Sequence, residues 1–498
     1  VINYGRLDDY LGPYLVADLE SGRLTDEEAY RYIHSLWTMI ENRRTTVNGR
    51  IIVGGKGRKH PKEADVFLHI AMKVAKNCRY VEPQFTLRFD KETSEEIWDE
   101  ALDALGAGAT YPTLYNDDVN VPAVMYGMRV DEKTAEQYVP FGCTEFVIQG
   151  QSTGTPNICI NLLKLLTIYM NDGIDPIDGK RKSGPVPLKK LEEYQTFEEF
   201  YDGYKALLDY YLDLSVKAQY HSYEVMNQHV SFLFTSLLTD DCIARGKALL
   251  DGGVRYLGGT NETYGNINTS DSLWVIRDLV FNQKKYTLRQ LNDAMLANFN
   301  GYEALRKDCL NCDKYGNDLE TADTMANDLY EFVAKGVRNR GIAIGMQYFL
   351  IVISNNQLNT EWGNRTAASP DGRLSCMYMN PANNPQGGAN KSGPTAMLNS
   401  LAKFDAKYHG GSVQNIKFSP SMFNENRAVI KSLFKTYFAK GGCHLMVTVV
   451  DKGVLEDAVE HPENYPDLIV RVSGFSAVFV DLSPNIQQEL LSRVLYDK

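Results

Sequence analysis

The stretch that decides the fold is Leu468-Ile469-Val470-Arg471-Val472-Ser473-Gly474-Phe475-Ser476-Ala477. Its first half is rich in β-branched residues and reads as a buried strand. A glycine in such a run is unexpected, because it has no side chain to pack and weakens the strand. Taken alone, Gly474 indicates either a bulge or a close approach of another part of the backbone, and a bend in a buried strand is the simplest interpretation.

A second unusual segment, Phe141-Gly142-Cys143-Thr144-Glu145, lies more than 300 residues upstream and leads into a loop rich in Gly, Gln, Ser and Thr. A lone cysteine is more often an inert, small hydrophobic residue than a reactive one. If the segment is extended, residues two apart project to the same side. Cys143 and Glu145 would then face the same pocket.

Together the two segments resemble the signatures of glycyl radical enzymes, Arg-Val-x-Gly-Tyr/Phe-Ser-Ala and Gly-Cys-x-Glu. Further landmarks resemble the same family in the same order: Gly5-Arg6-Leu7-Asp8, Gly252-Gly253-x-Arg255-Tyr256, Lys314-Tyr315-Gly316-Asn317-Asp318, Ser369-Pro370-Asp371-Gly372-Arg373-Leu374, Ser392-Gly393-Pro394-Thr395-Ala396, Gly410-Gly411-Ser412, Lys417-Phe418-Ser419-Pro420 and His461-Pro462-Glu463-x-Tyr465-x-Asp467-Leu468. The resemblance therefore covers essentially the whole chain. It implies a pyruvate formate-lyase-like protein of the Cys-x-Glu group.

The resemblance implies a role for each signature residue. Gly474 would store an unpaired electron on its α-carbon, which can flatten without a clash because it carries no Cβ. Cys143 would become the thiyl radical, and Glu145 would act as the general base. In a closed pocket the pKa of such a glutamate rises toward the range that a base needs.

Four residues are candidates for binding the substrate: Gln84, Arg88, Cys159 and Ser412. For Arg88, a structural salt bridge on a barrel strand is an equally good interpretation. Cys159 stands where the resembling hydroxyproline dehydratases have a tyrosine that contacts the substrate, which argues against hydroxyproline itself.

The residue after Cys143 narrows the reaction. Pyruvate formate-lyase places two cysteines side by side, whereas Thr144 follows Cys143 here. Cys-x-Glu resembles the dehydratases and C–X lyases instead, so we expect a lyase that removes water or another group from a small hydroxylated substrate. Arylacetate decarboxylases share the pattern, and decarboxylation is the alternative. Phe146 replaces the proline that is usual in diol and choline lyases.

Short strands that alternate with long helices predict an α/β fold. The resemblance implies a ten-stranded α/β barrel surrounded by helices, with a formate-lyase-like domain over residues 1–368 and a glycine radical domain over residues 369–498. The relatives begin well upstream of Gly5-Arg6-Leu7-Asp8, so the barrel is expected to be incomplete. A fragment or split subunit, inactive without an N-terminal region, is therefore a competing interpretation.

Local patterns predict individual elements. Thr25 and Glu28 form a capping box at the start of a helix, and Thr155-Pro156 resembles a cap followed by a proline at the first helical position. Strands are expected at Pro83–Phe89, Met446–Val450 and Leu468–Val472. The last helix is expected to begin at Ser483.

Composition excludes several classes of function. The formal net charge of −11 disfavours binding to nucleic acid or anionic membranes. Eight cysteines in 498 residues are too few for a disulfide scaffold, so a reducing cytoplasm is expected. Cys309-x-x-Cys312 lacks a second pair at zinc spacing, and no metal site is expected.

The resemblance also implies partners. A separate activating enzyme, which uses S-adenosylmethionine and an iron–sulfur cluster, would abstract hydrogen from Gly474, and the protein itself would bind no cofactor. The resemblance implies a homodimer. It also implies an anaerobic bacterium or archaeon as the host, because oxygen cleaves the backbone at a glycyl radical.

Overall fold

The computed structural model describes residues 3–44, 49–154, 156–353 and 357–497. The chain forms two compact units, each described here by itself. Unit 1 combines Val1–Ser152 with Asp405–Lys498, and unit 2 is Thr153–Phe404. These units divide the chain at other points than residue 368, and the division into 1–368 and 369–498 remains a prediction.

Unit 1 is built on a six-stranded sheet, as far as the described residues go. In spatial order its strands are β1 (Asn3–Arg6), β2 (Arg50–Gly54), β3 (Phe85–Phe89), β4 (Thr113–Asn116), β13 (His444–Val449) and β12 (Asn415–Phe418). The first four are parallel; β13 runs antiparallel to β4 and parallel to β12. Strands β2, β3 and β4 are buried throughout, which explains continuous apolar runs such as Ile51–Val53.

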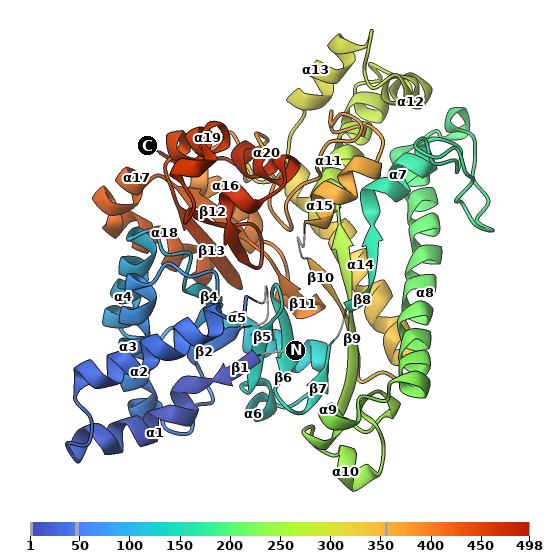
Figure 1. Cartoon of the computed structure of the whole chain (residues 1–498). Coiled ribbons are helices and arrows are strands. Elements are labelled where there is room, and N and C mark those ends of the chain that lie inside the picture. The colour runs from blue at the N-terminus through green and yellow to red at the C-terminus, as the bar shows by residue number, and fades with distance from the viewer. Residues whose placement is uncertain (1–2, 45–48, 155, 354–356, 498) are drawn as a thin grey trace. The chain divides into compact units, whose positions relative to one another are not determined.

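Helices accompany this sheet in Figure 1, where α1 to α4 lie together in blue beside the first strands. The helices of unit 1 are α1 (Leu7–Glu20), α2 (Asp26–Glu41), α3 (Pro61–Asn77), α4 (Glu95–Gly106), α5 (Asp117–Met128), α6 (Glu132–Ala135), α17 (Pro420–Glu425), α18 (Arg427–Ala439), α19 (Lys452–Glu460) and α20 (Pro484–Ser492). The capping box predicted at Thr25 and Glu28 is present, and α20 begins directly after Ser483 as predicted.

Two hairpins and one short strand complete unit 1. They are β5 (Tyr138–Phe141) with β6 (Glu145–Ile148), β14 (Ile469–Arg471) with β15 (Ser476–Val478), and β11 (His409–Ser412). The turn of each hairpin holds one of the two signature segments, Cys143 in the first and Gly474 in the second.

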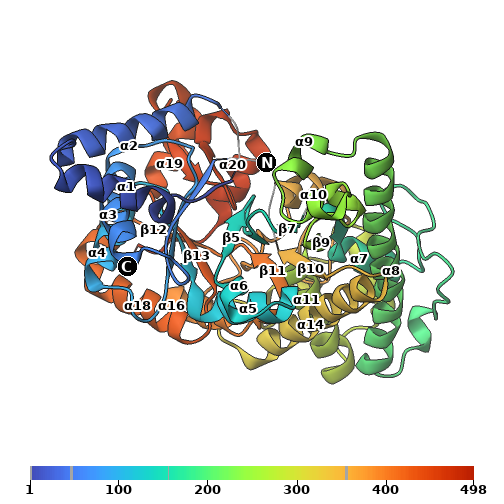
Figure 2. The ribbon, with the colours of Figure 1, turned by 90° about the horizontal axis from the view of Figure 1, so that it is seen from below.

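Unit 2 contains the parallel strands β8 (Pro156–Asn161), β9 (Tyr256–Tyr264) and β10 (Tyr348–Ile353). The two-residue strand β7 (Ser152–Thr153) lies at its boundary. Figures 1 and 2 both show the long helix α8 running beside these strands. The helices of unit 2 are α7 (Leu162–Met170), α8 (Phe197–His229), α9 (Leu233–Leu237), α10 (Cys242–Arg245), α11 (Asn266–Val275), α12 (Leu288–Leu296), α13 (Glu303–Asn311), α14 (Glu320–Ala343), α15 (Leu358–Glu361) and α16 (Gly393–Ala402).

The helix predicted to start at Thr155-Pro156 is wrong in its first turns. Residues 156–161 form β8, and α7 starts only at Leu162, capped by the Asn161 side chain, which accepts from Lys164 N at 2.9 Å. Thr155 itself lies outside the described residues. The β-branched Ile158 and Ile160 favour a strand once β9 is available as a neighbour.

The α/β class predicted from the sequence is confirmed in both units. Among the described residues, we find no helix with the length and apolar character needed to span a membrane.

Candidate active site

Cys143 lies in the tight turn that joins β5 to β6. Its side chain is 4% exposed, and Phe141 pairs with Glu145 across the turn. The extended segment that we expected from Cys143 to Glu145 is therefore wrong. Gly142 makes the turn possible because its φ is +52°, a left-handed conformation that favours glycine.

Glu145 folds its carboxylate back over this turn. Its Oε2 accepts from Thr144 N at 2.9 Å, and a Cβ placed on Gly142 would lie 2.7 Å from the same oxygen. Glu145 is 3% exposed. The thiol-bearing turn and the carboxylate thus form one buried group, although by a different geometry from the one predicted.

A buried arginine supports the turn from β2. Arg50 donates through Nη2 to Gly142 O at 2.8 Å and to Cys143 O at 3.4 Å, and through Nη1 to Thr86 Oγ1 at 2.7 Å. It also bonds Gln84 Oε1. Sequence reasoning missed Arg50. A charged residue directly before the fully apolar Ile51–Val53 was the available signal.

Gly474 lies against the Cys143 turn. A Cβ built on Gly474 would be 2.2 Å from Cys143 Cα, 2.3 Å from its Cβ and 2.5 Å from its carbonyl oxygen. Real Cβ atoms essentially never come within 3.0 Å of another heavy atom. Of the alternatives that the sequence left open at Gly474, the structure shows a close backbone approach, and the backbone that approaches it is that of Cys143.

Arg471 holds the Gly474 hairpin together from within. This buried side chain donates to Gly474 O at 3.1 Å and Ser476 Oγ at 3.0 Å, and it stacks over the Tyr111 ring at 4.9 Å. Ser476 Oγ in turn donates to Thr110 Oγ1 at 2.8 Å. Arginine and serine in the signature thus fix the backbone around the glycine.

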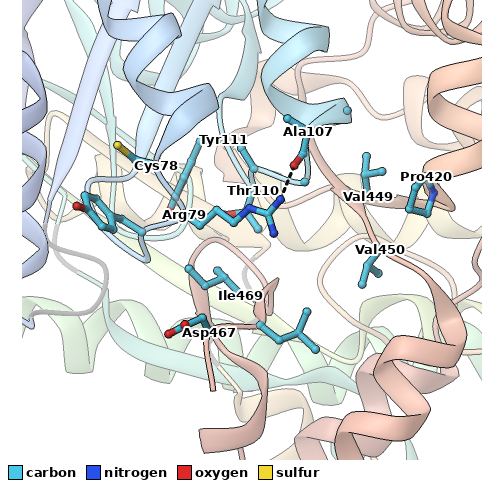
Figure 3. A pocket seen from close by; sticks show the side chains of 15 residues that line it. Cys78, Arg79, Ala107, Thr110, Tyr111, Pro420, Val449, Val450, Asp467 and Ile469 are labelled. Carbon is cyan, nitrogen blue, oxygen red and sulfur yellow. Dashed lines mark hydrogen bonds between the residues drawn. The ribbon is translucent and has the colours of Figure 1, made fainter. Parts of the chain in front are cut away.

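The entering strand of the hairpin lines a cavity of about 320 Å³. Figure 3 shows Thr110, Tyr111 and Ile469 among the residues around it, together with Arg79, which donates to Ala107 O at 3.0 Å. The hairpin is therefore packed less tightly on this side.

Ser412 lies at the end of β11, next to the same turn. Thr144 O would be 2.4 Å from a Cβ on the neighbouring Gly411, so β11 and the turn are in close contact. Ser412 is 2% exposed, and its Oγ has no hydrogen-bond partner among the described residues. Ser412 therefore stays a candidate for binding the substrate.

Arg88, by contrast, has its donors engaged. It forms a two-pronged ion pair with Asp117 at 2.7 and 2.9 Å, donates to Tyr138 O at 2.8 Å and stacks on the Tyr138 ring at 3.9 Å. Both partners of the ion pair are fully buried. This arrangement favours the structural interpretation of Arg88.

We expect Asp117→Asn to lower the free energy of unfolding by about 3–5 kcal/mol, because it leaves the buried Arg88 guanidinium unpaired. The matched control is Asp118→Asn, whose partner Lys56 is a third exposed, with an expected loss of no more than about 1 kcal/mol. Denaturant titration measures both. Equal losses would show that the Arg88–Asp117 pair is not structural.

Cys159 lies in unit 2, on β8. Its Sγ is 3.6 Å from Glu262 Oε2, which also accepts from Tyr264 Oη at 2.5 Å, and it lines a cavity of about 310 Å³. Burial, with the Glu262 carboxylate nearby, raises the pKa of Cys159 to about 12. Its thiol is therefore neutral at ordinary pH.

Groups that could bind a metal have simpler explanations in the part of the chain described. His69, Glu96 and Glu100 offer ligand atoms within 4.8 Å of one another, but His69 Nδ1 already pairs with Glu100 at 2.8 Å. Burial raises the pKa of Cys309 to about 12 and of Cys312 to about 11, which keeps both thiols protonated.

Comparison with known proteins places this geometry in a family. The model of the family "Pyruvate formate lyase-like" matches residues 1–358, and the model "Glycine radical" matches residues 379–480. The chain is 29% identical over 506 residues to trans-4-hydroxy-L-proline dehydratase of Clostridioides difficile, covering 98% of this chain and 64% of that protein.

Solved structures of glycyl radical dehydratases agree with this family assignment. The glycerol-bound B12-independent glycerol dehydratase from Clostridium butyricum has a TM-score of 0.90 at 28% identity, over 100% of this chain and 64% of that one. Hydroxyproline dehydratase from Clostridioides difficile, with its substrate bound, gives 0.92 at 26%, again over 100% and 64%. The chain thus spans 64% of the length of these relatives. The predicted fold class, the α/β fold of glycyl radical enzymes, is confirmed. The chain belongs to the pyruvate formate lyase-like family of glycyl radical enzymes.

Proposed function

We propose that the protein is a radical lyase that eliminates water or another leaving group from a small hydroxylated substrate. The observation that carries the proposal is the close approach of the Gly474 α-carbon to the Cys143 backbone and Cβ, with the Glu145 carboxylate folded over the same turn. A radical stored on Gly474 would thereby lie next to the residue whose thiol would use it.

The proposed reaction balances without an external redox reagent. The Cys143 thiyl takes a hydrogen atom from the substrate carbon that carries the hydroxyl, and Glu145 takes the hydroxyl proton. The resulting ketyl radical expels the leaving group, with its bonding electron pair, from the adjacent carbon. The product radical then recovers a hydrogen atom from the Cys143 thiol, so that a carbonyl compound and the protonated leaving group are formed.

The radical would be installed on Gly474 by an activating enzyme that uses S-adenosylmethionine and an iron–sulfur cluster. The two relatives compared above are named for trans-4-hydroxy-L-proline and for glycerol, both of which are small and hydroxylated. Of the binding candidates, Ser412 is next to Gly411, which contacts the Cys143 turn, and Gln84 is bonded to the Arg50 that supports this turn, while Cys159 stays a prediction. A homodimer and a cytoplasmic, anaerobic setting also remain predictions.

The test is anaerobic activation followed by paramagnetic resonance. We expect a doublet from the single hydrogen left on the glycyl α-carbon, which collapses in protein made with α-deuterated glycine. Exposure to air should then cut the chain at residue 474, and the fragment masses locate the cut without any mutation. The activated protein is then tested for turnover of a panel of diols, amino alcohols, sulfonates and arylacetates. No doublet in the unaltered protein would overturn the proposal.

For Glu145→Gln we expect turnover to fall by about 10²–10⁴-fold, the usual contribution of a general base, while the doublet keeps its size. The amide retains the shape of the side chain and an oxygen that can accept from Thr144 N. Glu132→Gln on the exposed helix α6 is the control and should leave turnover unchanged. Full turnover per spin in Glu145→Gln would exclude Glu145 as the base.

A further inference from the structure

A second arginine holds the Gly474 hairpin from outside. Arg493 directly follows α20, and its side chain is 11% exposed. Its Nη2 donates to Val472 O at 2.5 Å, and its Nη1 donates to Arg471 O at 3.4 Å. Arg493 thus binds the backbone of the hairpin two and three residues before Gly474.

Glu489 fixes the orientation of Arg493. Its two carboxylate oxygens accept from Arg493 Nε at 2.9 Å and from Nη2 at 2.7 Å, and Glu489 is 2% exposed. A forked guanidinium–carboxylate pair has a defined geometry as well as greater strength than a neutral hydrogen bond. The ion pair with Glu489 therefore holds the guanidinium in the orientation in which it donates to the Val472 carbonyl.

The end of α20 is itself fastened to the central sheet of unit 1. Lys417 Nζ on β12 donates to Leu490 O at 3.0 Å. Just beyond Arg493, Tyr496 N donates to Lys417 O at 3.0 Å, and Ser419 N donates to Tyr496 O at 2.9 Å. Arg493 is thus attached to the sheet, whereas the hairpin strands have only three residues each, and Ile469 of the entering strand lines the cavity of about 320 Å³.

We propose that Arg493 is a positioning residue that keeps Gly474 against the Cys143 turn, and that Glu489 sets its aim. The inference rests on the proposed function in one respect: the hairpin must leave this position when the activating enzyme takes hydrogen from Gly474. Arg493 then controls a balance. The closed hairpin transfers the radical to Cys143, and the open hairpin receives it.

Weakening the contact should shift that balance in a measurable way. A hydrogen bond to a charged group typically changes such an equilibrium by about 10- to 100-fold. In Arg493→Gln we therefore expect about tenfold faster amide hydrogen exchange at Val472 and Ser473, whose N–H groups both donate to Phe475 O within the hairpin. This measurement needs no activation. Arg493→Lys keeps the positive charge but not the two-pronged guanidinium geometry. Its exchange rate at Val472 and Ser473 should lie between those of the unaltered protein and Arg493→Gln.

With limiting activating enzyme, the doublet should grow faster in Arg493→Gln than in the unaltered protein, while turnover per spin falls. The control is Lys452→Gln on α19, which removes an exposed ion pair with Glu456 and should change neither quantity. A residue that is only structural would lower both quantities together.

The two ideas fail separately. Unchanged exchange at Val472 and Ser473 in Arg493→Gln would overturn the positioning role, whatever the activity. Faster exchange in a protein whose unaltered form never gives a doublet would overturn the proposed function and leave the positioning role standing. If Arg493→Gln does not fold, Glu489→Gln decides in its place, because it releases the aim of Arg493 and is expected to raise the exchange in the same direction.

Discussion

Cys143→Ser is expected to abolish turnover, on the order of 10⁴-fold or more, while Gly474 still acquires its radical. The two halves of the result have different causes. Installation depends on the glycine and on access to it. Turnover requires a hydrogen-atom carrier, and the O–H bond of serine is too strong for a glycyl radical to break, whereas the S–H bond of cysteine is close in strength to the glycyl C–H bond.

The measurement is the doublet amplitude together with product formed per spin. Serine differs from cysteine by one atom and occupies the same buried turn beside Arg50, so that the fold should persist. Cys78→Ser is the matched control, a half-buried thiol in the same unit that the mechanism does not use. Product formation by Cys143→Ser would exclude Cys143 as the carrier, and loss of its doublet would show that the turn is needed for installation.

Gly474→Ala is expected to lose the doublet and also to lower stability, by about 1–3 kcal/mol or more. The second effect follows from packing alone, because the new methyl group would overlap the Cα, Cβ and carbonyl oxygen of Cys143. Backbone atoms cannot swing aside as the end of a flexible side chain can. The hairpin must therefore move away from the turn.

This double effect decides how the variant is interpreted. Because the substitution also moves the hairpin, a missing doublet in Gly474→Ala does not locate the radical. The radical is located instead by the collapse of the doublet in protein made with α-deuterated glycine and by the position at which oxygen cuts the chain. Ser473→Ala is the control for stability. It changes the adjacent residue of the same hairpin and removes a buried hydroxyl without a partner among the described residues, so that we expect no loss. If Gly474→Ala proved as stable as the unaltered protein, the close contact would be wrong.

Local signals predicted elements well where a few neighbouring residues determine the outcome. Thr25 with Glu28 and Ser483 with Pro484 are examples, because a cap depends on atoms within one turn of the helix. The start of α7 was misplaced because residues 156–161 become a strand through β9, about 100 residues later in the chain. A sequence window cannot contain that neighbour.

The candidate site divides in the same way. Gly474, Cys143 and Glu145 were found because they lie in two compact motifs, although the turn geometry around Glu145 was not foreseen. Arg50 and Arg493 were missed because each acts on backbone carbonyls far from it in sequence. Every residue has a backbone carbonyl, so the sequence does not show which carbonyl an arginine binds, and an arginine is by default assigned to the surface.

The interrupted course of unit 1 has a consequence for how the protein is made. Strand β4 is complete at Asn116, but β13, its neighbour in the sheet, begins about 330 residues later at His444. At ordinary rates of synthesis, one edge of the nascent sheet waits roughly 15–65 s for its neighbour. Unpaired edges of this kind attract other chains. Low temperature and chaperones during expression should therefore improve the yield of folded protein more than any change to the two signature motifs.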